Sequence, residues 1–174
     1  MIKKIIGLML YNCIGKHLPV SFSKVQIGQK KFRCFCGKLI LERCGENVNI
    51  ERKALFSTKV EIGDGSGIGI RASIGGKCVI GDNVLMGPDC VIYTRNHEFS
   101  DLSIPIRGQG FQEEEPVIIG DDVWIGGRVT ILPGVHIGSH SVIGAASVVA
   151  KDVPEWSVVC GNPAVVKRSR KQGD

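Results

Sequence analysis

The sequence predicts an all-β chain wound as a parallel β-helix of about five coils, and three observations lead to that fold class. Apolar residues recur at every sixth position in two blocks, the residue after each is most often glycine, and the fourth residue after it is small or β-branched. Neither the helical period of about 3.6 residues nor the two-residue alternation of a strand produces a period of six. Hexapeptide units do, because three of them close one triangular coil of about 18 residues.

The two blocks of repeats account for the coils. The first block should form three coils, with Cys44, Ile50, Phe56, Ile62, Ile68, Ile74, Ile80, Met86 and Ile92 pointing inward. The second should form two coils, with Ile119, Ile125, Ile131, Ile137, Ile143 and Val149 inside. Each inward side chain is expected to stack on its equivalents above and below. The glycines fall where the backbone turns and a Cβ would be crowded or would need a positive φ.

Residues 1–43 precede the repeats and are predicted to be a basic, largely helical segment that caps the first coil. Residues 1–38 contain eight basic residues and no acidic one. One face of a first helix should carry Ile2, Ile5, Ile6, Met9 and Cys13. This face could pack on the prism or across a subunit boundary, or it could make weak peripheral contact with an anionic membrane. The apolar run is too short to span a bilayer and lacks the cleavage site of a signal peptide.

A second helix is predicted from about Gln29 to Leu41, because apolar residues follow the helical spacing there: Phe32, Phe35, Cys36 and Leu39. It would cover the open first coil, whose unpaired backbone would otherwise invite edge pairing. With the repeats assigned to residues 44–160, the remaining 161–174 form a basic C-terminal tail. The 174 residues fit one domain, and the repeat accounts for its 23 glycines and few aromatics.

The cysteines indicate a reducing environment. There are seven of them, an odd number. Cys78 and Cys90 fall at small inward positions, and Cys34 and Cys36 lack a second pair that would complete a zinc site. We therefore expect reduced thiols, a cytoplasmic chain and no metal requirement.

The repeat breaks between Ile92 and Ile119, which are 27 positions apart and so not a multiple of six. The segment from about 94 to 116 must leave the prism as a loop, and loops of this length in a compact domain are usually functional. Asn96 and His97 stand at its base, and the acidic run 113–115 lies at its far end. His97 is the candidate for proton transfer, since an imidazole titrates near neutral pH.

The ordered motifs resemble the hexapeptide-repeat acyltransferases, closest to the maltose, galactoside and polysaccharide O-acetyltransferases. They are IGDNVLMGPD at 80–89, the Asn96–His97 pair, IGDDVWIGG at 119–127, ILPGV at 131–135, VAKDVP at 149–154 and GNPA at 161–164. The resemblance covers about residues 44–168. It implies a left-handed β-helix, acetyl-CoA as cosubstrate, a saccharide acceptor, and a homotrimer with sites between prisms; no nucleic-acid partner is expected.

The resemblance also implies roles for residues. His97 would be the general base that deprotonates the acceptor hydroxyl, with one of the glutamates 113–115 as a candidate to orient it. The cofactor side would be Trp124, Gly127, Ala145, Ala150, Lys151 and Arg168, with the Gly127 N–H facing the thioester oxyanion. Substrate contacts would involve Asn96, Gly67, Gly75 and Glu114. Gly67 and Gly75 replace an Asn and an Asp that contact sugar in galactoside-type members, which favours a bulkier glycan or lipid-linked saccharide.

Three alternatives remain open from the sequence. An antibiotic O-acetyltransferase would use the same prism, histidine and loop. An enzyme of the γ-carbonic-anhydrase type would need three histidines around a metal, and the spacing of His136 and His140 relative to His97 does not match it. A non-catalytic scaffold would use the repeat for assembly alone.

Overall fold

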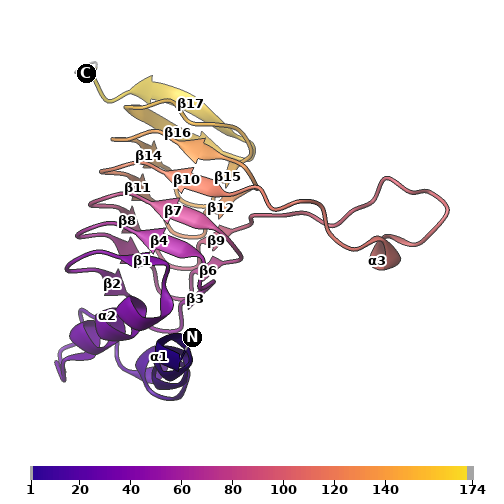
Figure 1. The fold of residues 1–174 in the computed structure, drawn as a ribbon. Helices are drawn as coiled ribbons and strands as arrows, with labels where there is room; N and C mark the ends of the chain where they lie inside the picture. The colour runs from indigo at the N-terminus through magenta and orange to yellow at the C-terminus, as the bar shows by residue number, and fades with distance from the viewer. Residues whose placement is uncertain (1, 172–174) are drawn as a thin grey trace.

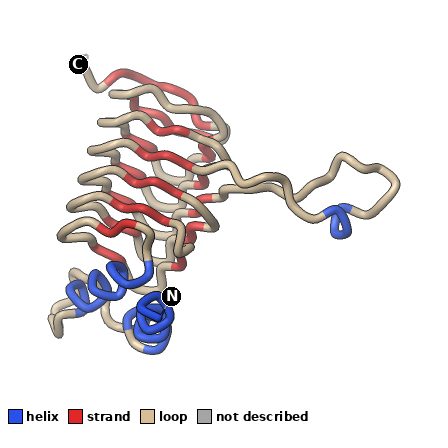
Figure 2. Tube along the Cα trace, in the orientation of Figure 1, coloured by secondary structure: helices blue, strands red, loops and turns tan. Residues whose placement is uncertain are grey.

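The computed structural model describes residues 2–171, so Met1 and the last three residues of the predicted C-terminal tail lie outside the described residues. The repeats wind as a parallel β-helix of about six turns, with two helices at one end and one long loop projecting sideways (Figures 1 and 2). The predicted fold class is confirmed.

Three faces form the prism, and each coil crosses them in the order first, second, third. The first face stacks β1 (Arg43–Cys44), β4 (Val60–Ile62), β7 (Cys78–Ile80), β10 (Val117–Ile119) and β13 (His136–Ile137). The second stacks β2 (Asn49–Ile50), β5 (Gly67–Ile68), β8 (Leu85–Met86), β11 (Trp124–Ile125), β14 (Val142–Ile143) and β16 (Ser157–Gly161). The third stacks β3 (Leu55–Phe56), β6 (Ser73–Ile74), β9 (Val91–Ile92), β12 (Thr130–Ile131) and β15 (Val148–Val149).

The strands pair in the register that the repeat requires. Cys44 pairs with Ile62 and Ile62 with Ile80, one coil apart each time. Ile80 then pairs with Ile119, so the loop between them leaves the register intact. Each inward residue therefore stacks on its equivalent in the next coil.

The predicted core is confirmed. All the six-spaced apolar positions are buried except Cys44 and Phe56, which are partly buried against the same core. The small positions four residues on are buried as well: Val48, Ala54, Val60, Ser66, Ala72, Cys78, Val84, Cys90, Val123, Val129, Val135, Ser141, Ser147 and Val153. Each buried isoleucine contributes about 1.5–3 kcal/mol relative to an exposed one. All seven cysteines are free in the structure.

One corner of the prism carries a ladder of aspartates. Asp64 accepts a hydrogen bond from the Glu46 N–H one coil earlier, at 2.8 Å. Asp82 accepts from the Asp64 N–H at 2.7 Å, and Asp121 accepts from the Asp82 N–H at 2.8 Å. These carboxylates satisfy backbone donors that the turn leaves without a strand partner. The motif letters Gly-Asp thus have a structural role at this corner.

Beyond Val149 the chain adds a further turn to the five predicted coils. Val153 bridges to Ile137, and β16 pairs in parallel with β14. The chain then reverses, and β17 (Ala164–Ser169) pairs antiparallel with β16. Part of the predicted tail is therefore a strand that ends the rod (Figure 1).

Helices α1 (Ile2–Cys13) and α2 (Gln29–Ile40) cap the opposite end, as predicted, with a short 3-10 turn at Gly15–His17 between them. Helix α2 faces the first coil with Arg33, Cys36, Gly37 and Ile40. Helix α1 lies close to α2 because Gly7 has no side chain, and a Cβ there would come within 2.7 Å of the Leu39 Cβ.

The face by which α1 packs is not the one that the apolar pattern singles out. Its buried residues are Gly7 and Tyr11. The Tyr11 hydroxyl donates to the Ala54 carbonyl at 2.8 Å, and burial raises the pKa of this phenol. The predicted apolar face instead lies on the exposed side of the helix. Among residues 2–171, no helix combines the length and apolar character needed to cross a bilayer.

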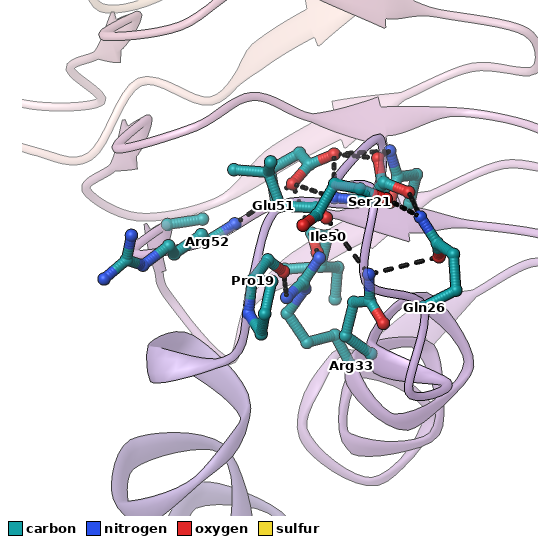
Figure 3. A network of polar contacts seen from close by, with 12 residues as sticks. Pro19, Ser21, Gln26, Arg33, Ile50, Glu51 and Arg52 are labelled. Carbon is teal, nitrogen blue, oxygen red and sulfur yellow. Dashed lines mark hydrogen bonds and ion pairs between the residues drawn. The ribbon is translucent and has the colours of Figure 1, made fainter.

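A buried ion pair joins the cap to the first coil (Figure 3). Arg33 is fully buried, and its guanidinium donates to the carbonyls of Ile50 and Pro19 and lies 3.4 Å from the Glu51 carboxylate. Glu51 also accepts from the Ser21 hydroxyl and N–H. Because each polar group has partners from a different segment, the network ties α2, the connection before it and the second face together.

The predicted loop runs from the end of β9 to the start of β10 and contains only the short helix α3 (Ile106–Gln109). It leaves the prism where the third face passes to the first and extends far from the coils (Figure 2). Leu102, near its far end, is 98% exposed in this single chain.

Candidate active site

The base of the loop is a two-stranded stem that holds His97 in place. The Glu115 N–H donates to the Thr94 carbonyl at 2.7 Å, and the Gln112 N–H donates to the Asn96 carbonyl at 3.0 Å. His97 and Phe111 form an antiparallel bridge in this stem. Candidate residues Asn96 and His97 are therefore on ordered backbone next to the prism, with exposed side chains.

The His97 ring has defined contacts. Its Nδ1 lies 3.2 Å from the Gly110 carbonyl oxygen, and its ring stacks on Phe111 with centroids 4.3 Å apart. The Arg95 guanidinium lies 4.0 Å from the centre of the same Phe111 ring. Since a carbonyl only accepts hydrogen bonds, Nδ1 is the donor of this contact, and in the neutral ring the lone pair is then on Nε2.

The contact recorded for Nδ1 is thus a backbone carbonyl and not one of the glutamates 113–115. Glu114 turns toward the prism, where its carboxylate bonds the Lys59 ammonium at 2.6 Å and the Lys77 N–H at 2.7 Å. The hydrogen bond from Lys59, followed by that from Lys77, holds the pKa of Glu114 below its usual range. In this chain Glu114 fastens the loop stem to the neighbouring coil.

Gly75 and Gly76 form the turn below the loop, at the same corner as His97. A Cβ at Gly76 would lie 2.0 Å from the Glu114 carboxylate, so glycine leaves the space that this contact needs. Candidate substrate residues Asn96, Gly75 and Glu114 are thereby grouped with His97 at the third–first corner.

Trp124 and Gly67 lie elsewhere, on the second face. Trp124 pairs in register with Leu85 and Val142 on the adjacent coils. Trp124 and Leu85 are both more than half exposed, at 54% and 63%, and offer an apolar surface. In a triangular coil the second face is opposite the third–first corner, so one chain does not bring Trp124 and His97 together (Figure 1).

Gly127 and Ala145 stack at the corner between the second and third faces. A Cβ on Gly87 would lie 2.5 Å from the Gly127 nitrogen, and one on Gly126 would lie 2.6 Å from the Ala145 nitrogen. The backbone of successive coils therefore comes into close contact at this corner, which presents a narrow column of small residues. Such a column suits an extended chain lying along the rod.

The remaining cofactor candidates lie near the C-terminal end. Ala150 and Lys151 are exposed just after β15. Arg168 is on β17, paired in register with Val158, and its side chain is exposed. Ala150 and Lys151 follow the third face and so lie at the third–first corner, whereas Arg168 lies on the strand that pairs with β16 of the second face.

The other histidines have separate surroundings. His140 Nδ1 lies 3.0 Å from Asp122, and its ring stacks on Trp156 at 4.0 Å between centroids. His136 is on β13 of the first face. Within residues 2–171, no three His, Cys, Asp or Glu side chains are grouped so that they could hold a metal ion.

Comparison with known proteins identifies the family. The family described as "Bacterial transferase hexapeptide (six repeats)" matches residues 59–94 and 116–151. A putative acetyltransferase of Saccharomyces cerevisiae is 42% identical over 78% of this chain and 69% of its own length. The galactoside O-acetyltransferase of Escherichia coli is 34% identical over 92% of this chain and 79% of its length. The chain belongs to the hexapeptide-repeat acetyltransferases.

A solved structure extends the likeness to the fold and the cofactor. The hexapeptide-repeat acetyltransferase of Vibrio cholerae in complex with acetyl coenzyme A has a TM-score of 0.78 at 30% identity and covers 98% of this chain and 88% of that one. This hexapeptide-repeat acetyltransferase is an acetyl-CoA-dependent enzyme. For some relatives the match covers less than half of the relative's own length. The chain spans 44% of the galactoside O-acetyltransferase of Lactococcus lactis.

Three residues of the site were not predicted from the sequence: Gly110 and Phe111, which contact His97, and Arg95, which lies over the Phe111 ring. No periodic pattern marks them, because they meet across an irregular loop. The only signal in the sequence was the Gly110–Phe111 pair toward the C-terminal end of the loop, which lies opposite Asn96–His97 when the two ends of the loop pair.

Proposed function

We propose that this acetyltransferase moves an acetyl group from acetyl-CoA to a hydroxyl of a saccharide, with His97 as the general base. The observation that carries the proposal is the Nδ1 contact of His97 with the Gly110 carbonyl at 3.2 Å, which makes Nε2 the proton acceptor. A neutral imidazole in that tautomer can take the proton of a hydroxyl as it attacks the thioester.

We propose that the acetyl group passes directly from CoA to the acceptor, without a covalent enzyme intermediate. The acceptor oxygen bonds to the acetyl carbonyl carbon as its proton passes to Nε2 of His97. The tetrahedral intermediate collapses, its carbon–sulfur bond breaks, and the leaving thiolate takes the proton back as CoA thiol. The Gly127 N–H is proposed to stabilise the oxyanion. Trp124 would lie along the pantetheine, followed by Ala145, Ala150 and Lys151, with Arg168 at a phosphate.

A complete site would need two chains. His97 is at the third–first corner, whereas Trp124 is on the opposite face of the same prism. A homotrimer, in which the corner of one prism meets the face of the next, would bring the two groups together. The exposed Trp124 and Leu85 support this assembly, because contact would cover their apolar surface.

Light scattering should therefore give a mass of three times the 18.8 kDa chain. Mixed trimers of His97→Ala and Trp124→Ala subunits, co-expressed and purified through two tags, should recover activity that neither variant has alone. About one site in three would be intact, since two-tag purification keeps only mixed trimers and each of these has one interface with both unaltered residues. A fully active monomer, or no recovery in the mixture, would contradict the shared site.

The acceptor assignment rests on the glycines near the candidate site. Gly75 at the third–first corner and Gly67 on the second face carry no side chain that could hold a small sugar, which leaves room for a glycan or a lipid-linked saccharide. Release of CoA thiol should be measured across glycosides, oligosaccharides, lipid-linked sugars, chloramphenicol and streptogramins. Turnover confined to the two antibiotics would replace the saccharide proposal with the antibiotic one. We also propose a cytoplasmic location, consistent with the free thiols.

Removal of metal ions provides a further prediction. The thioester is already an activated acyl donor, so dialysis against EDTA should leave the rate of thiol release unchanged. The control is the same protein dialysed with the Zn²⁺ complex of EDTA. Loss of activity that added Zn²⁺ restores would favour a metal enzyme of the γ-carbonic-anhydrase type.

A further inference from the structure

Helix α1 presents an apolar face to solvent on the side opposite the one that packs. Gly7 and Tyr11 are buried against α2 and the first coils. At 100° per residue, Ile2, Ile6 and Met9 fall on the other side of the helix. With Ile5 they are 48–73% exposed. A surface helix normally carries polar residues on its outer side, so this helix has a second apolar face that the chain itself does not cover.

The exposed apolar surface continues beyond α1. The connection between the two helices carries Phe22, Val25 and Ile27, and Phe22 is 74% exposed. Phe35 stands on the side of α2 that faces away from the first coil. All of these residues belong to the helical cap at one end of the rod (Figure 1). We call this set, with the α1 residues above, the cap surface.

The charges that residues 2–38 bring to the cap surface are of one sign, and one of them, Lys38, is paired with Glu46 of the first coil. Residues 2–38 contain no acid, and their seven lysines are Lys3, Lys4, Lys16, Lys24, Lys30, Lys31 and Lys38. The buried Arg33 is paired with Glu51. Lys30, Lys31 and Lys38 also surround a shallow hollow that contains Phe35. The lysines of this hollow thus lie beside the exposed ring of Phe35.

We propose that the cap surface docks peripherally on an anionic lipid bilayer. Apolar side chains enter the boundary between headgroups and acyl chains, while lysines meet the lipid phosphates. Two copies of the cap would place lysines against lysines, so charge complementarity favours a negatively charged partner over a second copy. Only the apolar side chains and lysines of the cap carry this docking, which does not depend on the acetyl-transfer reaction.

Docking would set the position of the candidate site. The cap is at the end of the rod, and the loop leaves sideways after the third coil. Successive coils are about 4.8 Å apart. The level of His97 along the rod would therefore be on the order of 10–15 Å farther from the membrane than the first coil. If the proposed function holds, a saccharide on a membrane lipid would reach the site without leaving the bilayer.

The test is sedimentation of the full chain with vesicles of phosphatidylcholine alone or with 30 mol% phosphatidylglycerol. We expect binding to the anionic vesicles that weakens at least tenfold between 50 and 500 mM salt, and little binding to the neutral ones. Ile5→Ser with Met9→Ser should weaken it at least tenfold. Lys3→Gln with Lys4→Gln should do the same, at roughly fivefold per lysine.

Matched controls lie at the far end of the rod. Val165 and Val166 on β17 are exposed to a similar degree, and Val165→Ser with Val166→Ser should bind vesicles like wild type. Every variant is also measured by light scattering and circular dichroism. The proposal is overturned if wild type does not sediment with anionic vesicles, or if the β17 pair weakens binding as much as the α1 pair. A lowered oligomer mass for folded Ile5→Ser with Met9→Ser would overturn it too, because a second copy would then be the occupant.

Discussion

Replacement of His97 by alanine is expected to lower kcat at least ~100-fold, because it removes the group that would take the acceptor proton. The KM for acetyl-CoA should change little, since His97 is proposed to act on the acceptor hydroxyl and to make no binding contact with the cofactor. Initial rates of thiol release at saturating acetyl-CoA and acceptor give both constants.

The control is His136→Ala, which removes an exposed histidine from β13 on the first face and should keep wild-type turnover. A second variant, Phe111→Ala, removes the ring that stacks on His97 while leaving the imidazole and the Gly110 carbonyl in place. It should retain more activity than His97→Ala. If His97→Ala keeps more than half of the wild-type kcat, His97 has no part in proton transfer.

Loss of Glu51 is expected to have the largest effect on stability. In Glu51→Ala the fully buried Arg33 keeps its two backbone carbonyls but loses its counter-ion. Breaking a buried pair in this way typically costs about 3–5 kcal/mol. Urea unfolding followed by circular dichroism should show the loss as a lower midpoint with an unchanged slope.

Glu46→Ala is the matched control, because it removes an exposed ion pair with Lys38 and should barely change the midpoint.

Acid should reproduce part of the effect of losing Glu51. Burial raises the pKa of Glu51, but hydrogen bonds from Ser21 and Asn49 outweigh burial and hold it below its usual range. Because the pKa of Glu51 is lower in the folded state than in the unfolded state, its ionised form stabilises the fold at pH values above the unfolded-state pKa. This stabilisation is lost as the pH falls through the folded-state pKa. A Glu51→Ala midpoint equal to wild type at pH 7 would contradict the role of the pair.

The coils could be predicted because the inward position in each six-residue repeat has similar burial. Ile62 and Ile80 share a position in the period and also a stack in the core. β17 could not be predicted in this way, since an antiparallel return strand follows no such period. For α1, the pattern identified an apolar face correctly, but Gly7 decides which side packs, because only a glycine lets α2 approach.

In the candidate site, too, the local features could be predicted and the long-range contacts could not. The loop boundaries and His97 followed from the break in the repeat, a local feature of the sequence. The Gly110 carbonyl and the Phe111 ring meet His97 across 13 and 14 residues of irregular chain, and pairing of that kind has no periodic signature. The contacts of Glu114 with Lys59 and Lys77 join separate coils, so they too became visible only in the structure.

The return of β17 along β16 has a consequence for the length of the rod. Stacked coils can in principle continue without limit, since each top edge is a template for another strand, as in fibrils. Here β17 covers the last strand of the second face, while α1 and α2 cover the first coil. A chain cut after Gly161 would expose β16 as an unpaired edge at one end. Folded rods of that shortened chain are expected to join end to end into filaments, whereas the 174-residue chain is expected to stay a discrete particle.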